Sequence, residues 1–280
     1  MPYPILTLSH PFSRRLCQLL TPEELENLQL AAGPEIRNLK PIVQSFYDQN
    51  PQFRFFEDAA KVLLYLKDID EITDNYTLSL LKCETLTFIE VTDLQFKNSD
   101  FSHIYFKANE LAFQKCHLTV DYLKYVASII NAHGLLKLCL SISNDLDDDI
   151  NFAFVFKTFP NLNDLSVGRA YNGWVNDLLN TNVTDLRSFS VYHNNYEELF
   201  SFKASDLHRF IKKQLPNFVV KMNVQCEPDA TDDDLKKVKK KMKKLMTRRF
   251  RFRTSQFGKL KVLIYYYANP HFQNIACFYC

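Results

Sequence analysis

The sequence predicts an α/β fold: an irregular solenoid whose parallel sheet carries helices on its outer side, preceded by a small helical segment. Three observations support this prediction. Pairs of apolar residues, one position apart, recur at intervals of 25, 27, 27, 24 and 31 residues. Apolar residues spaced three and four apart follow these pairs, as in amphipathic helices. Pro160 and Pro216 end two of the helical stretches. Such strand–helix units bury their apolar faces only by stacking on one another.

The clearest copy of the repeat is residues 111–118, which read L-x-L-x-x-C-x-L, the strand and turn signature of a leucine-rich repeat. Helical spacing follows it at Val120, Leu123 and Val126. We therefore expect residues 83–280 to form a leucine-rich-repeat-like domain. An ordinary α/β domain with alternating strands and helices is the alternative interpretation. The same apolar pair recurs at Leu86 and Phe88, Leu138 and Leu140, Leu165 and Val167, Phe189 and Val191, and Val220 and Met222.

The N-terminal part predicts three short helices over residues 13–20, 23–32 and 35–47. Thr21 and Glu24 are spaced as a capping box for the second helix, and Pro22 suits its first turn. We expect residues 1–45 to form one helical segment. Residues 46–82 are expected to form a helical linker or an N-terminal cap of the repeats.

Residues 1–45 combine a Leu and a Pro with an apolar helix and a later leucine-rich helix ending in small residues. The residues of this pattern are Leu8, Pro11, Leu16, Leu19, Leu20, Pro22, Glu24, Leu25, Leu28, Leu30 and Ala32. In this pattern the segment resembles an F-box. An F-box-like segment before leucine-rich repeats is similar to the substrate receptors of cullin-type ubiquitin ligases, in particular the divergent F-box proteins of nematodes. A helical cap that shields the first repeat is the alternative.

This resemblance implies a protein-binding role without catalysis. The N-terminal helices would bind a Skp-type adaptor protein, and the repeats would hold an unknown target protein for ubiquitin transfer. A leucine-rich-repeat scaffold with no link to ubiquitin is one alternative. The adaptor-binding residues that the resemblance implies are Leu8, Pro11, Leu16, Leu19, Leu20, Pro22, Leu25 and Leu28.

The target-binding surface is predicted on the concave face of the sheet. In each L-x-L strand the two apolar side chains point to the helices, so the residue between them and those beside them point to the other face. Tyr192 is the best single anchor, because tyrosine is enriched in binding hot spots. Binding confined to loops is the alternative. The predicted face comprises Gln114, Lys137, Cys139, Ser141, Asp164, Ser166, Ser188, Ser190, Tyr192, Lys221 and Asn223.

The C-terminal part, residues 227–280, predicts a basic helix followed by a β-hairpin formed by residues 248–253 and 259–267. Residues 236–261 contain 13 Lys or Arg and no acidic residue, whereas residues 1–226 contain 21 basic and 27 acidic residues. Nucleic-acid binding through residues 236–261 is therefore a second functional hypothesis. We favour the alternative that the narrow apolar stripe of the helix packs on the repeats while the lysines face water.

Catalytic motifs are absent from the sequence, which carries no G-x-S-x-G, phosphate-binding glycine loop or H-E-x-x-H, so we expect no enzyme activity and no cofactor. No metal site is expected either. Cys277 and Cys280 could bind zinc only with two further ligands, such as Cys226 and His271. With seven scattered cysteines, no export signal and no membrane span, we expect a cytoplasmic or nuclear protein.

Overall fold

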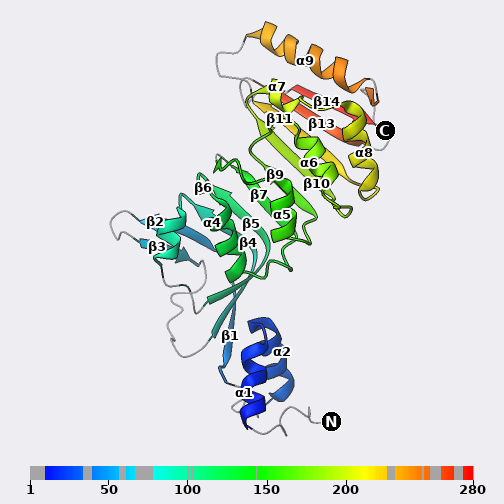
Figure 1. Cartoon of the computed structure of the whole chain (residues 1–280). Helices are drawn as coiled ribbons and strands as arrows, with labels where there is room; N and C mark the ends of the chain where they lie inside the picture. Colours follow the sequence, from blue (N-terminus) through cyan, green and yellow to red (C-terminus); the bar gives the residue numbers. More distant parts are fainter. Residues whose placement is uncertain are drawn as a thin grey trace.

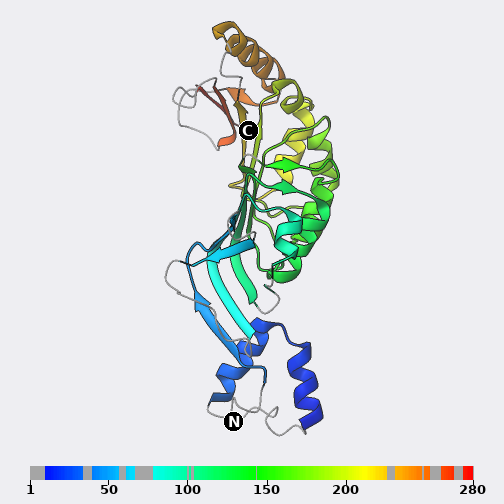
Figure 2. The same cartoon turned by 90° about the vertical axis from the view of Figure 1, so that its left-hand side faces the viewer.

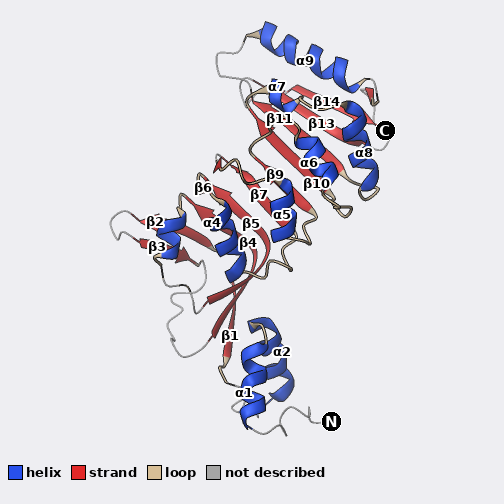
Figure 3. Cartoon of the chain, in the orientation of Figure 1, coloured by secondary structure: helices blue, strands red, loops and turns tan. Residues whose placement is uncertain are grey.

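The computed structural model describes residues 10–33, 40–56, 61–66, 78–99, 101, 104–142, 144–225, 231–247, 249–252, 260–267 and 274–279. Within them the chain is α/β, with one large and mostly parallel sheet (Figure 1). Figure 3 shows the strands in red as a long array that runs from the N-terminal helices to the C-terminal end. The α/β class that the sequence predicts is confirmed.

The helices and strands follow one another in a largely alternating order. The strands are β1 (Val43–Tyr47), β2 (Gln52–Phe56), β3 (Lys61–Tyr65), β4 (Leu78–Ile89), β5 (Ile104–Gln114), β6 (His117–Leu118), β7 (Lys137–Ile142), β8 (Asp145–Leu146), β9 (Asp164–Val167), β10 (Ser188–His193), β11 (Val219–Gln225), β12 (Arg251–Phe252), β13 (Leu260–Tyr267) and β14 (Asn274–Tyr279). The helices are α1 (His10–Leu19), α2 (Pro22–Ala32), α3 (Asp93–Lys97), α4 (Val120–Ile129), α5 (Phe152–Thr158), α6 (Trp174–Asn180), α7 (Tyr196–Leu199), α8 (Ala204–Lys213) and α9 (Asp232–Met246).

Twelve of the described strands form the large sheet, in the order β12-β14-β13-β11-β10-β9-β7-β5-β4-β2-β3, with β1 also paired to β4. Pairing is parallel from β13 through β11, β10, β9, β7 and β5 to β4. It is antiparallel at both ends, where β2 pairs with β3 and β14 pairs with β13 and β12. The parallel centre therefore requires a crossover connection between successive strands, and helices supply several of these.

The apolar pairs found in the sequence lie in one register across the sheet. The first residue of each pair is directly opposite the first residue of the next, and every one of them is buried. β13 extends the same row with Val262, although its interval from Val220 is much longer because α9 is inserted between the two strands. The row is Leu86, Leu111, Leu138, Leu165, Phe189, Val220 and Val262.

Helices α4, α5, α6 and α8 lie along one side of the sheet (Figure 2). Short polar residues begin two of them: Thr119 accepts a hydrogen bond from the backbone N–H of Tyr122 in α4, and Asn151 does so from Phe154 in α5. Such caps satisfy amide groups that have no partner inside the helix. Their buried residues join those of the strands in one continuous core. The helix ends predicted before Pro160 and Pro216 are confirmed, since α5 ends at Thr158 and α8 at Lys213.

Aromatic rings dominate this core at the α4 end of the sheet. Phe88 stacks on Phe53 with ring centroids 4.8 Å apart and on Phe113 at 5.1 Å. Tyr122 of α4 meets Phe113 edge to face at 5.8 Å. Offset and edge-to-face pairs of this kind add stabilisation beyond the burial of their area, so β2, β4, β5 and α4 form one packed unit.

The prediction for residues 46–82 is wrong in its secondary structure. The described part of that range contains strands β2 and β3, the end of β1 and the start of β4, and no helix. The predicted helix over 35–47 is also wrong in its described part, where β1 occupies Val43–Tyr47 and crosses the expected boundary at residue 45. The reason is pairing: β1 and β2 both add to β4 in parallel, which satisfies their backbone groups better than short isolated helices would.

The predicted C-terminal hairpin pairs differently from expectation. β13 forms an antiparallel hairpin with β14, and the short β12 pairs with the other side of β14 instead of with β13. β13 is also paired in parallel with β11, so it is an inner strand of the sheet. Val262 and Ile264, which face the core, explain this inner position.

Candidate functional site

The predicted target-binding residues lie on the sheet face that alternates with the buried apolar pairs. Register pairing brings most of them together on four neighbouring strands, β7, β9, β10 and β11. They form three rows: Lys137, Asp164 and Ser188; Cys139, Ser166, Ser190 and Lys221; and Tyr192 with Asn223.

Short polar contacts connect parts of these rows. The Ser166 hydroxyl donates a hydrogen bond to Ser141 Oγ at 2.9 Å, and Ser141 Oγ lies 3.3 Å from Cys139 Sγ. Gln114 of β5 pairs with Ile142 across a register shift. The register of Leu111 with Leu138 would place Gln114 opposite Ser141, so Gln114 is one position out of step and the predicted face is least regular at β5.

Two members of the predicted face are buried. Ser190 and Asn223 each expose only 8% of their surface, so these two positions offer little contact area to a partner. On the neighbouring strands, Ser190 lies opposite Lys221, and Asn223 lies opposite Tyr192 and Tyr265, so each small side chain has a longer one beside it. Tyr192, at 37% exposed, is thus the main large contact surface of the face.

The N-terminal helices α1 and α2 pack on each other and on the edge of the sheet through a small separate core. Cys17 and Leu25 are its buried members, and Leu20, Leu28, Ala32, Val43 and Leu78 pack against them. The predicted capping box is confirmed: Thr21 Oγ1 accepts from the Glu24 amide and the Glu24 carboxylate accepts from the Thr21 amide. Since Val43 and Leu78 belong to β1 and β4, this helical pair depends on the sheet for part of its core.

Leu25, one of the residues predicted to bind an adaptor, is only 1% exposed. It supports the helical pair from inside. Leu16, Leu20, Pro22 and Leu28 are partly buried, Pro11 and Leu19 are exposed, and Leu8 lies outside the described residues. Among the described members of the predicted adaptor-binding set, some side chains are therefore buried or partly buried and others are exposed.

Three residues of α1 form an exterior apolar face: Phe12, Leu16 and Leu19. Their spacing of four and three places them on one side of the helix. Phe12 and Leu19 are 67% and 66% exposed, while Cys17 on the other side is buried. Sequence reasoning missed Phe12, because the F-box pattern has no position for it. The helical spacing with Leu16 and Leu19 was the signal that could have revealed it.

Polar contacts fix α2 against the sheet. Glu26 forms an ion pair with Lys82 of β4 at 2.7 Å, and Glu23 pairs with Lys107 of β5. Burial alone would raise the pKa of Glu26, but hydrogen bonds from Lys82 and Ser45 and the nearby lysine charges hold that pKa below its ordinary value. The ionised carboxylate therefore stabilises the attachment of α2.

The basic helix α9 packs as the favoured interpretation predicts. In its apolar stripe Val238, Met242 and Met246 are fully buried and Leu235 and Leu245 are partly buried. Lys236, Lys239 and Lys240 are exposed. Thr231 and Asp234 form the predicted capping box. Hydrogen bonds from Lys237 and Thr231 lower the pKa of Asp234 to about 2. Of the proposed nucleic-acid region 236–261, residues 248 and 253–259 lie outside the described part.

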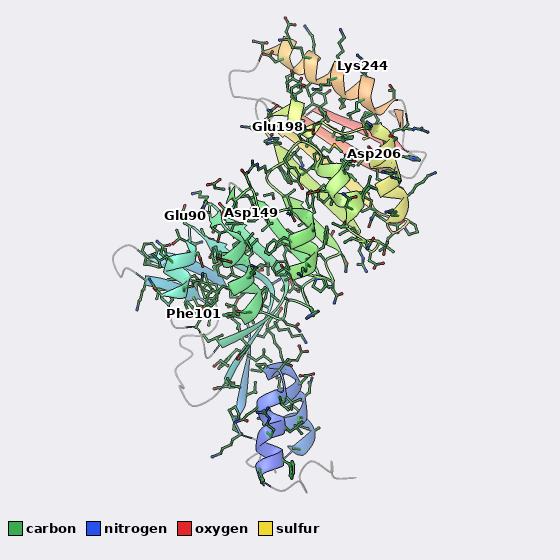
Figure 4. All side chains as sticks on the ribbon, viewed as in Figure 1. Glu90, Phe101, Asp149, Glu198, Asp206 and Lys244 are labelled. Carbon is green, nitrogen blue, oxygen red and sulfur yellow. The ribbon has the colours of Figure 1, made fainter. Side chains whose placement is uncertain are left out.

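A cavity of about 550 Å³ lies between α9 and α7. Figure 4 shows Lys244 on α9 and Glu198 on the neighbouring α7. Sequence analysis missed this site because Tyr196 and Phe200 are far from the lysines along the chain. Its lining consists of Tyr196, Glu197, Phe200, Lys237, Lys240, Lys241, Lys244 and Leu245.

The described residues contain no group of three or more His, Cys, Asp or Glu side chains that could hold a metal ion. Three of the four zinc ligands considered above, Cys226, His271 and Cys280, fall outside the described part. Burial raises the pKa of Cys83 to about 12, which makes its thiol a poor nucleophile. None of the described helices has the length and apolar character that a bilayer crossing requires.

Comparison with known proteins gives no relative for this chain: no family model, no curated protein and no solved structure matches it.

Proposed function

We propose that this chain is a non-catalytic, substrate-binding subunit of a cullin-type ubiquitin ligase that acts in the cytoplasm or nucleus. In this proposal α1 and α2 bind a Skp-type adaptor, and the sheet forms an irregular leucine-rich-repeat solenoid that holds a target protein. The observation that carries the proposal is the exposed apolar face of α1 at the end of a sheet built from in-register repeats.

The in-register rows support the solenoid. Six apolar pairs with similar spacing in the sequence occupy equivalent positions on successive parallel strands. Each unit contacts mainly its neighbours, as repeat architectures do. The face that alternates with the pairs offers a row of small and polar residues with Tyr192 as the anchor.

The exposed face of α1 supports adaptor binding. Large apolar side chains such as Phe12 and Leu19 are seldom left exposed together without a partner. Their face points away from Cys17 and Leu25, so a partner can cover it without disturbing the core of the helical pair. Leu25 and Leu28 act indirectly, by holding α1 on α2.

Co-purification with a Skp-type adaptor tests the proposal. The variant Phe12→Asp with Leu19→Asp should lose the adaptor while its circular dichroism stays unchanged, because both side chains are exposed. The matched control is Leu94→Asp on α3, which alters an equally exposed leucine (69%) far from α1 in the sequence. Absence of adaptor binding by the unaltered chain would leave a leucine-rich-repeat scaffold with no ubiquitin link.

Nucleic-acid binding through residues 236–261 is the second candidate, supported by the exposed lysines of α9. If these lysines all contacted phosphate, the logarithm of the affinity would fall steeply with the logarithm of the salt concentration. We expect a shallow dependence, because α9 also carries Asp233 and Asp234, which pair with Lys236 and Lys237. Filter binding at several salt concentrations distinguishes the two results.

A further inference from the structure

The cavity between α7 and α9 has the size of a small-molecule site. Its volume of about 550 Å³ is within the range of ligand pockets in proteins. It is bounded on one side by α7 and the following Phe200 and on the other by α9. Two elements that are about 40 residues apart in the sequence thus form the two walls of one open cleft.

Four lysines line this cavity at positions 237, 240, 241 and 244 of α9. Their spacing of three and four places them on one side of the helix. At 1.5 Å per residue they span roughly 10 Å, the length of a short chain of phosphoryl groups. These four ammonium groups face the cavity, whereas Lys236 and Lys239 are exposed elsewhere on the same helix.

Two of the four lysines have an acidic partner. Lys237 forms an ion pair with Asp234, and Lys241 with Glu197 of α7. Lys240 and Lys244 form no ion pair with any described residue. These two ammonium groups can accept an anion without breaking an existing contact, and lysine is a common ligand of phosphate.

Apart from Glu197, the rest of the cavity wall consists of the aromatic and apolar side chains of Tyr196, Phe200 and Leu245. Phe200 is almost fully buried, Leu245 is partly buried, and the Tyr196 ring lies beneath the Lys241 ammonium at 5.4 Å. A ligand that satisfies both halves of the site carries clustered negative charge and an apolar or ring-shaped body. The carboxylates of Asp233, Asp234 and Glu197 interrupt the positive surface, which disfavours an extended nucleic-acid strand.

We propose that this cavity binds a small organic polyphosphate, with its phosphoryl groups at Lys240 and Lys244 and its ring body against Phe200 and Leu245. Glu197 competes with the ligand for Lys241. The site is independent of adaptor binding by α1, because it lies at the opposite end of the sheet (Figure 1).

Isothermal titration of the full chain with adenosine triphosphate, inorganic tripolyphosphate and adenosine tests the proposal. Both polyphosphates should bind and adenosine alone should not. If adenosine triphosphate binds more tightly than tripolyphosphate, its ring contacts the cavity wall. If the two bind equally, the protein recognises the phosphoryl chain alone. Lys240→Gln with Lys244→Gln should weaken binding on the order of tenfold or more, since each lysine contributes a charge-assisted contact.

The matched control is Lys236→Gln with Lys239→Gln, which removes the same charge from α9 outside the cavity. It should change affinity by less than about threefold, because only long-range attraction is lost. Glu197→Gln should tighten binding, since it releases Lys241. Glutamine is a good helix former, so α9 should stay folded, which circular dichroism checks.

Three results would overturn the proposal. Equal loss in the two lysine pairs would mean general electrostatic attraction. Tighter binding of a long single-stranded oligonucleotide, with a steep salt dependence, would assign the lysines to nucleic acid. No binding of either polyphosphate by the unaltered chain would leave the cavity without this ligand.

Discussion

The sheet and the N-terminal helical pair are stabilised in different ways. The sheet has one continuous core that extends from Phe53 to Phe278. The helical pair has only Cys17 and Leu25 as buried residues in its own core, and it takes the rest of its support from β1 and β4. The sheet has a large core, so it can carry binding residues on its surface without loss of stability. The pair of helices α1 and α2 is too small to be stable alone and depends on its contacts with the sheet.

The largest effect should come from the core of the sheet. Trp174 of α6 is fully buried, stacks on Phe189 at 5.7 Å and donates from Nε1 to the Leu199 carbonyl at 3.1 Å. Trp174→Ala should destabilise the chain by about 3–5 kcal/mol, since it leaves a large cavity. Urea unfolding followed by circular dichroism measures this. Leu94→Ala, on the surface, should change the stability by less than about 0.5 kcal/mol. Similar values for the two variants would contradict the core assignment.

A smaller and local effect is expected in the helical pair. Leu25→Ala should lower the free energy of local unfolding of α1 and α2 by about 2–4 kcal/mol. The sheet should stay intact, because Leu25 belongs to the separate core. Amide hydrogen exchange should therefore speed up in α1 and α2 only. Faster exchange throughout β7 to β11 would show that the two regions unfold together.

Acid should weaken the contact between the two regions. The folded-state pKa of Glu26 is lowered, so its ionised form contributes stability that is complete above its ordinary value of 4.5. This contribution is lost as the pH falls through the lower folded value. It is less than about 1 kcal/mol, because Lys82 is partly exposed. Exchange in α2 should increase below about pH 4.5, and Glu26→Gln should remove that dependence. If the pH profile of exchange in α2 were unchanged in Glu26→Gln, the pH dependence would come from other carboxyl groups.

The smallest effect on stability is expected on the sheet face. Tyr192→Ala with Lys221→Glu alters partly exposed side chains, so unfolding should shift by less than about 1 kcal/mol. Capture of a target protein identified by pull-down and mass spectrometry should nevertheless fall strongly. Unchanged capture would move the target site to the loops or to α9.

The centre of the fold could be predicted because burial repeats along the sequence. Each strand places two apolar residues such as Leu138 and Leu140 against the helices, and this requirement recurs with every unit. The repeat pattern did not predict β13, because the insertion of α9 makes the interval between Val220 and Val262 longer than the others. The strands β1, β2 and β3 were not predicted, because they are short and are held by pairing: β1 and β2 pair with β4, and β3 pairs with β2.

The candidate sites were less predictable than the fold. The burial of Ser190 and Asn223 was not predictable from their own strands, because it depends on which residues of the neighbouring strands lie beside them. Leu25 and Leu19 look alike in the sequence, yet one is interior and the other exterior. The cavity at α7 and α9 exists only because the chain returns to bring Tyr196 beside Lys241.

Amide hydrogen exchange of the full chain, with and without a Skp-type adaptor, tests the central proposal most directly. The account predicts that the adaptor slows exchange in residues 10–19, which carry Phe12, Leu16 and Leu19, and leaves the strands β7 to β11 unchanged. Slowed exchange confined to the sheet or to α9, with α1 unaffected, would contradict it.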